Sequence, residues 1–290
     1  MMFGTYVAGI SVADDRAHLA VLQVKKGDVR LKYLGEFARA GERELWFLEE
    51  LLAGKEKALR KVSRVSVALD HAEAVQHCFP SDSSLSGSDE QDQIVWELSN
   101  LIPAFDPEAY TREKHLLQTH AHRQFSDVLV VAYRKSLLKH AEASLRSKNI
   151  GLEDVGTNHF GAQHALFLAN PEVKSKMVAL VHVMRNRVDV GLINRGKLIH
   201  YRTARAESAP AVLDVLADRL SSFSVSDIFL HGPAVSPGLT EEAGKRFASA
   251  VTNLNPFREM KVASSFGEFD SYRGKEHRFA SAVGSALRSH

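Results

Sequence analysis

The chain is almost free of cysteine and contains no long hydrophobic run. With Cys78 as its single cysteine it cannot form an intrachain disulfide, which fits a reducing compartment. No apolar stretch reaches the roughly 18 residues that a membrane-spanning helix needs. Residues 1–12 have neither the basic flank nor the cleavage site of a signal peptide. We expect a cytoplasmic protein without direct membrane insertion.

An excess of charge of one sign is also missing. The 290 residues include 37 Lys and Arg against 35 Asp and Glu, a formal net charge of +2. No overall basic field therefore favours nucleic acid or an anionic membrane as a partner. The hydrophobic share of 44% and the charged share of 25% are ordinary for a soluble globular protein.

Common catalytic and metal-binding motifs are absent as well. The sequence has no GxSxG nucleophile elbow, no HExxH zinc motif and no P-loop. His120 and His122 form the tightest histidine pair, but without a nearby third ligand this pair indicates an exposed loop rather than a metal site. Cys78 follows His77 without a third group in reach, so we expect a buried or inert thiol. We expect no metal.

What the sequence does contain is a repeated plan of strands. An apolar strand, the polar turn Asp14-Asp15, a second strand and a turn at 25–28 are followed by further elements: a strand at 29–34, a helix at 42–60 and a strand at 62–69. The same order returns later, with strands at 177–183, 188–193 and 198–204, a helix at 209–221 and a strand at 228–230. A repeat at this distance predicts two related lobes.

A different pattern separates the two halves. Residues 80–87 form a loop by composition, and Ser88 with Gln91 predicts a capping box for a helix at 89–102 that Pro103 ends. Strands at 110–119 and 127–133 and a helix at 136–148 follow. We predict an inserted α+β subdomain at 74–150. The first lobe then comprises 1–73 and 151–175, and a reduced second lobe with a C-terminal helix comprises 176–290.

Several stretches together resemble the PilM family of bacterial type IV pilus assembly proteins, relatives of FtsA in the actin-like ATPase superfamily. The likeness covers nearly the whole chain and is carried by 9–18 (GISVADDRAH), 96–103 (WELSNLIP), 105–108 (FDPE), 128–134 (VLVVAYR), 152–163 (LEDVGTNHFGAQ), 229–239 (FLHGPAVSPGL), 255–257 (NPF) and 282–288 (AVGSALR). It implies an α/β fold, the duplicated two-lobe actin-like (ribonuclease H-like) fold with an inserted α+β subdomain. A type II secretion counterpart stays open, because the L protein of that system has a related cytoplasmic domain.

The resemblance also locates a nucleotide cleft, in which this sequence departs from the family pattern. Ser11 replaces the magnesium-holding carboxylate, Ala13 replaces a glycine, and Asp14 and Asp15 stand where small hydroxyls are expected. At about 6 Å and an effective dielectric of about 20, each carboxylate would repel a phosphate charge by about 3 kcal/mol.

The other half of the predicted cleft departs in the same direction. His182 replaces the second aspartate, and Met184 replaces a glycine. The adenosine turn keeps Gly232, but Pro233 follows it and removes a backbone N–H donor. Residues 205–227 leave room for one helix, where the family usually has a further small subdomain over the nucleotide. We therefore expect a pseudo-ATPase without a cofactor.

The sequence leaves two alternatives open. One is an active ATPase that binds ATP and magnesium through Asp14 or Asp15, with Arg185 and Arg187 clamping an anion. The other is a small-metabolite kinase of the same superfamily, for which no catalytic base stands out.

The resemblance further implies a partner. In the family, the cytoplasmic tail of an inner-membrane pilus protein docks in a groove between the first lobe and the inserted subdomain. The matching residues here are Leu98, Ile102, Pro103 and Phe105, although Leu98 and Ile102 also fit a helix core. We expect a scaffold held at the inner membrane through this partner. The partner's identity and any homo-oligomer stay open.

Overall fold

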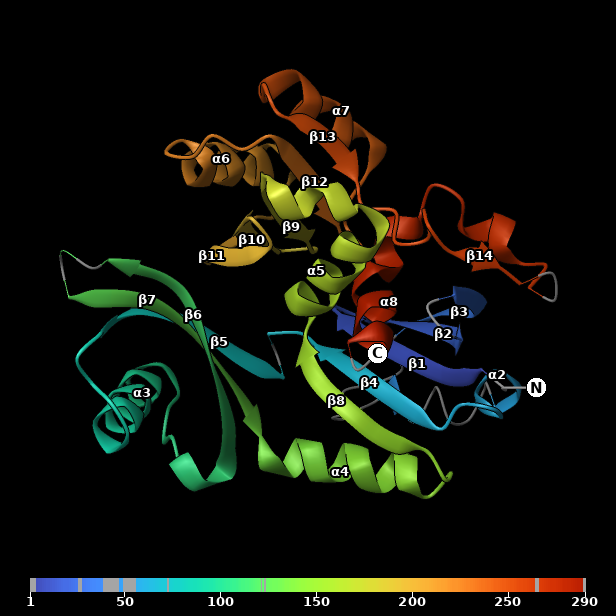
Figure 1. The fold of residues 1–290 in the computed structure, drawn as a ribbon, viewed down its shortest axis with the longest axis horizontal. Helices are drawn as coiled ribbons and strands as arrows, with labels where there is room; N and C mark the ends of the chain where they lie inside the picture. The colour runs from blue at the N-terminus through green and yellow to red at the C-terminus, as the bar shows by residue number, and fades with distance from the viewer. Residues whose placement is uncertain are drawn as a thin grey trace.

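The computed structural model describes residues 4–25, 28–38, 47–48, 56–71, 73–120, 122, 124–263 and 266–288. Two large sheets lie on either side of a central pair of helices, and a smaller sheet projects to one side (Figure 1). Most of the helix predicted for 42–60 lies outside the described residues, and α2 (Glu56–Leu59) is its described end. Among the described residues, no helix is both long enough and apolar enough to span a membrane.

The first sheet has six strands in the order β14-β3-β2-β1-β4-β8. Their bounds are β1 Thr5–Ala13, β2 Arg16–Lys25, β3 Asp28–Ala38, β4 Arg64–Leu69, β8 Gly151–Thr157 and β14 Lys261–Val262. Strand β1 pairs antiparallel with β2 and parallel with β4, and residues 7–13 are fully buried. The predicted N-terminal strands are therefore confirmed, with β1 at the sheet centre.

The second sheet repeats this arrangement in the order β11-β10-β9-β12-β13. Its elements are β9 Met177–Val183, β10 Arg187–Asn194, β11 Lys197–Arg205, α6 Ala209–Leu220, β12 Asp227–His231, α7 Pro237–Arg246 and β13 Ala250–Asn253. Strand β9 pairs antiparallel with β10 and parallel with β12, as β1 does with β2 and β4. The connection from β11 to β12 holds the single helix α6, as predicted.

Two helices pack between the sheets: α5 (Asn158–Ala169) and α8 (Ala280–Leu287). Glycines permit their close approach. A Cβ on Gly284 would lie 1.7 Å from the carbonyl oxygen of Gly161, and one on Gly9 would lie 1.8 Å from that of Ala282. No side chain fits at these positions, so the central packing depends on them.

The C-terminal segment departs from the predicted domain division. The sequence predicts that 176–290 form the second lobe, but β14 pairs with β3, and α8 packs on β1 of the first sheet. Phe257, Phe266 and Phe279 join the hydrophobic cluster of the first lobe around Leu22. The chain therefore returns to its first lobe, because the apolar surface of β2 and β3 requires a cover. The short helix η3 (Pro171–Ser175) joins α5 to β9, and η4 (Phe269–Tyr272) and η5 (Glu276–Phe279) lie between β14 and α8.

The smaller sheet has three strands in the order β5-β7-β6. Its elements are β5 Ala74–Asp82, α3 Ser88–Leu101, η1 Pro107–Ala109, β6 Tyr110–His120, β7 Phe125–Arg134 and α4 Lys135–Arg146. Helix α3 packs through Ile94 and Leu98 on the sheet face that is turned away from α5 (Figure 1).

The predicted boundary at 73/74 lies between β4 of the first sheet and β5 of the smaller sheet. The boundary at 150/151 differs from the packing, because α4 lies against β8 and its Leu137, Ala141 and Leu145 belong to the hydrophobic cluster of β4. The strands and helices predicted within 74–150 are present, and residues 80–82 of the predicted loop belong to β5.

The predicted capping box is wrong. Helix α3 begins at Ser88 itself, preceded by Gly87 at φ 58°, and the helix N-terminus has no side-chain cap. Glycine at the preceding position allows the positive φ with which the loop enters the helix, and this places Ser88 inside the first turn.

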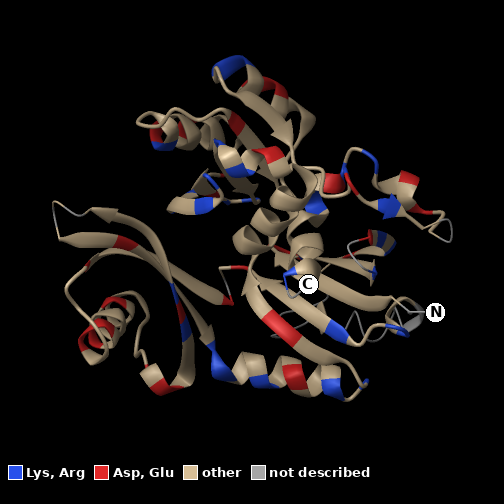
Figure 2. Ribbon diagram, viewed as in Figure 1, with Lys and Arg blue, Asp and Glu red and all other residues tan. Residues whose placement is uncertain are grey.

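Lys and Arg are mixed with Asp and Glu over all three sheets and their helices, and neither charge sign is confined to one side of the ribbon (Figure 2). This distribution agrees with the near-zero net charge.

Candidate functional site

The turns of the two homologous hairpins meet across the lobes. The turn Asp14-Asp15 joins β1 to β2, with Asp14 in the left-handed region at φ 54°. The Asp14 carboxylate accepts a hydrogen bond from the backbone N–H of Arg185, with Oδ2 2.7 Å from the nitrogen. The N–H of Asp14 in turn donates to Oδ2 of Asp70 over 3.1 Å. The first turn is thus tied both to the end of β4 and to the second hairpin.

Arg187 makes a second connection between the lobes. Its guanidinium donates to the Asp70 carboxylate, and its Nε lies 3.3 Å from Oδ1 of Asp189. Its Nη2 also lies 2.9 Å from the sulfur of Met184. Burial alone would lower the pKa of Arg187, but the charges of Asp189 and Asp70 outweigh it and raise that pKa. Arg187 is therefore a charged link, already occupied by two carboxylates.

A row of polar side chains crosses the second sheet beneath this link. The register sets Asp189 beside His182 and His182 beside His231. The two imidazoles stack with centroids 4.6 Å apart, and Nδ1 of His182 lies 3.6 Å from Oδ2 of Asp189. Burial would raise the pKa of Asp189, but the interaction with His182 and the charge of Arg187 lower it to about 2. Burial lowers the pKa of His231 well below its ordinary value.

The glycine turn predicted for the adenosine is packed against the same histidine. Gly232 has φ 108°, and a Cβ there would lie 2.6 Å from Cδ2 of His182. The N–H of Gly232 donates to the carbonyl of His277 over 3.2 Å, and that of Ala234 donates to the carbonyl of Val183 over 3.2 Å. The turn therefore uses its backbone donors within the protein.

The remaining predicted cleft residues divide into buried and exposed ones. Ser11, Ala13 and Met184 are buried. The Asp15 side chain is 64% exposed and lies 3.9 Å from Arg16, so Asp15 does not enter the cleft. The Arg185 side chain is exposed as well, and its backbone N–H is the group that contacts Asp14. Burial is the main reason that the pKa of Asp14 is raised.

Asp70 accepts hydrogen bonds from the Asp14 N–H and from Arg187, and it is not among the site residues predicted from the sequence. An available signal was its position directly after the buried strand β4, because the carboxyl ends of parallel strands meet at the ligand-facing edge of such sheets. His231 and His277 were not singled out either, since their partners are distant in sequence.

The histidines and the cysteine considered for chemistry have ordinary structural contacts. His120 lies 2.9 Å from Oδ2 of Asp127 and packs on Phe125. Within the described ranges, no group of three His, Cys, Asp or Glu side chains could hold a metal ion. Burial raises the pKa of Cys78 to about 11, which disfavours a thiolate at neutral pH.

The predicted partner residues surround α3 and its C-terminus. Leu98 is 0% exposed and belongs to the core between α3 and the three-stranded sheet, so as folded it cannot contact a partner. Ile102 and Phe105 are half-buried against the same core, and the Phe105 ring packs on Tyr110 with centroids 5.1 Å apart. Pro103 is exposed.

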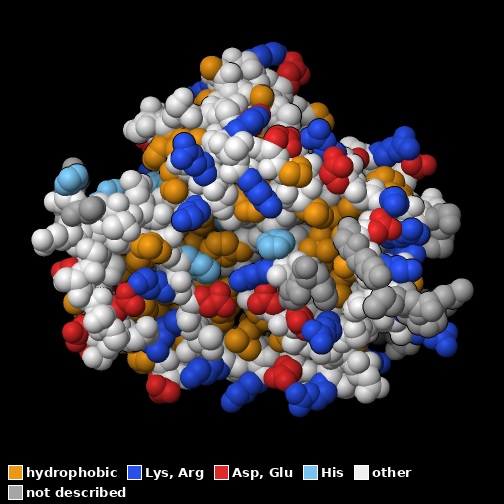
Figure 3. Space-filling view, viewed as in Figure 1, with side chains coloured by type: hydrophobic (Ala, Val, Ile, Leu, Met, Phe, Trp, Pro, Cys, Tyr) orange, Lys and Arg blue, Asp and Glu red, His pale blue; other side chains and the backbone are white. Residues whose placement is uncertain are grey.

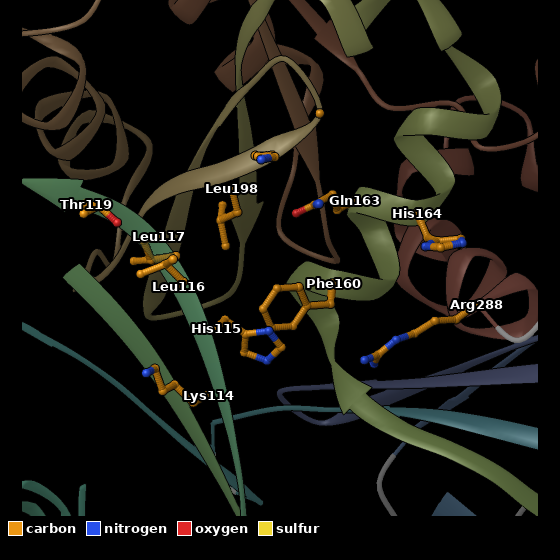
Figure 4. Close-up of a pocket in the computed structure, with 12 residues that line it drawn as sticks. Lys114, His115, Leu116, Leu117, Thr119, Phe160, Gln163, His164, Leu198 and Arg288 are labelled. Atoms are coloured by element: carbon orange, nitrogen blue, oxygen red, sulfur yellow. The ribbon is translucent and has the colours of Figure 1, made fainter. Parts of the chain in front are cut away.

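A cavity of about 740 Å³ lies on the other side of the inserted sheet. It is bounded by β6, by α5, by the β10–β11 turn and by Arg288 (Figure 4). Its apolar lining comprises Leu116, Leu117, Phe160 and Leu198. In the view of Figure 3, hydrophobic and histidine side chains are exposed near the centre of the molecule, with Lys and Arg as well as Asp and Glu side chains close by. None of the predicted partner residues lines this cavity.

Comparison with known proteins identifies the fold. Neither a protein-family model nor a curated protein matches the sequence. A chain of the PilM–PilN type IV pilus biogenesis complex superposes with a TM-score of 0.75 at 14% identity, covering 97% of this chain and 98% of that one. A Bacteroides thetaiotaomicron protein with an actin-like ATPase fold and unknown function gives 0.57 at 11% identity, covering 87% and 92%.

The ethanolamine utilization protein EutJ from Carboxydothermus hydrogenoformans gives a TM-score of 0.54 at 9% identity, covering 99% of this chain and 90% of that one. These likenesses, together with the repeated sheet topology, confirm the predicted fold class. The chain has a PilM-like version of the actin-like ATPase fold.

Proposed function

We propose that the chain is a non-catalytic, actin-like scaffold that binds the cytoplasmic tail of a membrane-anchored pilus or secretion assembly protein. The observation that carries the non-catalytic part is the bond from the Arg185 N–H to the Asp14 carboxylate. The Asp14 carboxylate therefore accepts from a backbone N–H that faces the cleft, and this donor is not free for a phosphate.

Three further features support a cleft without nucleotide. A phosphate at about 6 Å from the Asp14 carboxylate would be repelled by about 3 kcal/mol at an effective dielectric of about 20. The buried side chain of Met184 fills the second turn and contacts Arg187. The glycine turn after β12 uses its backbone donors within the protein, because the N–H groups of Gly232 and Ala234 donate to the carbonyls of His277 and Val183.

The scaffold part of the proposal is supported by the fold. The chain superposes over nearly its full length on a member of the PilM–PilN complex, whose name describes an assembly of two proteins. Under this proposal the protein is cytoplasmic and is recruited to the inner membrane by its partner. ATP and magnesium are then not required for binding.

One experiment tests both parts. Peptides tiled across the cytoplasmic segments of inner-membrane proteins encoded beside this chain's gene are titrated with the full-length protein, with and without 1 mM magnesium ATP. We expect at least one tile to bind, with the same affinity in both conditions. Binding that needs ATP would contradict the non-catalytic part, and the lack of any binding tile would contradict the scaffold.

A further inference from the structure

Helix α3 carries the most exposed large hydrophobic side chain among the residues that the structure describes. Trp96 is 63% exposed, and no described aromatic ring or cation packs on it. It lies two positions from each of Ile94 and Leu98, the buried residues of α3, and two positions correspond to a rotation of about 200° around a helix. Trp96 therefore points away from the core that α3 shares with the three-stranded sheet, and the packing of the fold does not explain a tryptophan here.

The chain around Trp96 contains carboxylates and no cation. Residues 78–111 include no Lys, Arg or His, although the whole chain has slightly more Lys and Arg than Asp and Glu. The acidic residues of this stretch are Asp82, Asp89, Glu90, Asp92, Glu97, Asp106 and Glu108. In Figure 2, α3 is an exception to the mixing of charges, since it shows red segments and no blue ones. A surface of one charge sign favours a partner of the opposite sign.

Two of these carboxylates lie on the same face of α3 as Trp96 and are unpaired. The other two carboxylates of α3 have partners, Glu90 in Lys114 and Glu97 in His77. Asp89 and Asp92 are exposed, and no described donor or cation contacts either of them. Asp92 precedes Trp96 by four positions and Asp89 precedes it by seven, so the three side chains form one row along the helix.

This row complements an arginine side chain. A guanidinium can stack flat on an indole ring and donate two parallel hydrogen bonds to a carboxylate, whereas a lysine ammonium acts as a point charge. Side chains four positions apart are neighbours on a helix surface, so one guanidinium can reach both Trp96 and Asp92. Tryptophan is also enriched among the residues that dominate the binding energy of protein interfaces.

We propose that the row Asp89, Asp92 and Trp96 is a docking surface for a second protein, which presents an arginine that stacks on Trp96 and pairs with Asp92. This partner differs from the membrane-anchored tail of the proposed function. Helix α3 lies on the face of the inserted sheet that is turned away from α5, so the row faces away from the first lobe (Figure 1). A scaffold with this surface can hold a second protein while a tail is bound elsewhere.

The chemistry of the partner can be tested with a phage library of random octapeptides selected on the immobilised full-length chain. We expect the selected peptides to contain Arg next to an apolar residue. Trp96→Gln should weaken their binding at least tenfold without a change in the unfolding temperature, because the indole is exposed. Leu116→Gln is the matched control, since Leu116 is also a highly exposed apolar residue but lies on β6, and it should leave the affinity unchanged.

A charge reversal tests the ion pair separately. Asp92→Lys should weaken the binding of the selected peptides at least tenfold, and a new round of selection on this variant should no longer enrich Arg. Glu242→Lys, at an exposed position of α7, is the matched control and should change neither result. A selection that yields no binding peptide, or binding that survives Trp96→Gln or Asp92→Lys, would overturn the proposal.

Competition and sedimentation distinguish the protein that occupies this surface. A tail tile that binds under the proposed function should not displace a selected peptide, and the chain should not self-associate through Trp96. Displacement by the tile would mean that the tail itself occupies α3, and self-association that Trp96→Gln abolishes would assign the surface to a second copy. Either result would overturn a separate arginine-bearing partner. The absence of any binding tile would overturn the proposed function alone.

Discussion

The carboxylate of Asp14 accepts a hydrogen bond from the backbone N–H of Arg185, 171 residues away in sequence. The two residues lie in equivalent turns of the duplicated lobes, and the bond joins these turns directly. With the Arg187–Asp70 pair beside it, the cleft is closed by groups of the protein itself.

Removal of the Asp14 carboxylate should loosen this closure. Asp14→Gly keeps a residue that tolerates φ 54° but deletes the acceptor. We expect the free energy of unfolding to fall by about 1.5–3 kcal/mol, the range for a hydrogen bond to a charged group. Urea denaturation measures it, with Asp15→Gly, in the exposed half of the same turn, as the control. Equal losses in the two variants would show that the carboxylate of Asp14 adds no stability.

Arg187 should contribute more to stability, because its removal leaves two carboxylates without their cationic partner. In Arg187→Met, both Asp70 and the buried Asp189 lose their cationic partner. Breaking such a buried pair costs about 3–5 kcal/mol. Arg205→Met, at a side chain that is 83% exposed, should change the free energy of unfolding by less than about 0.5 kcal/mol. If both variants unfold at the same urea concentration, Arg187 is not a structural link.

The central contact of α5 and α8 should not tolerate a methyl group at Gly284. Gly284→Ala places a Cβ against the backbone of Gly161, and we expect a loss of at least about 1–3 kcal/mol. Gly244→Ala in α7 meets no atom within 4 Å and should stabilise the protein by up to about 1 kcal/mol. Thermal unfolding of both variants measures the contrast, and a neutral Gly284→Ala would mean that the helices can separate at no cost.

Buried histidines should make the protein sensitive to acid. Burial lowers the pKa values of His18 and His159 to about 4, below the ordinary 6.5. Between these values the unfolded chain binds more protons than the folded one, so stability is lost as the pH falls from 6.5 to 4. Each histidine adds about 1.4 kcal/mol per pH unit to this slope.

The slope can be measured by urea denaturation at pH values from 4.5 to 6.5. His159→Leu should reduce it by the contribution of one histidine, whatever the change in packing does to the absolute stability. His140→Leu, at an exposed position of α4, should leave the slope unchanged. An unchanged slope in His159→Leu would show that His159 takes up its proton in the folded state.

Local patterns in the sequence predicted the strands and also the turns in which this chain departs from the PilM-family pattern. The alternation in 29–34 and the apolar runs around Asp14-Asp15 and 184–187 depend on side-chain periodicity, which one sequence displays. Contacts between distant segments could not be read in the same way. Nothing local to Lys261-Val262 indicates pairing with β3, and nothing local to Asp70 indicates that Arg187 lies beside it.

The partner surface shows the same limit. The helical stripe with Leu98 predicts an apolar face, but only the fold decides that the three-stranded sheet already covers it. The position of β6 beside the cavity could not be recognised from sequence, because strand order within a sheet depends on which strands pair. The lining of the cavity beside β6 combines residues from β6, α5, β11 and the C-terminal end of α8.

A thermal-unfolding scan with and without millimolar magnesium ATP tests the central claim most directly. A nucleotide present at 100 times its dissociation constant would add about 2.7 kcal/mol of stability, which corresponds to about 5 °C for a chain of this size. The closed cleft predicts no shift. A shift of several degrees would mean that the turns open to admit phosphates, and the chain would then be a nucleotide-binding protein rather than a silent scaffold.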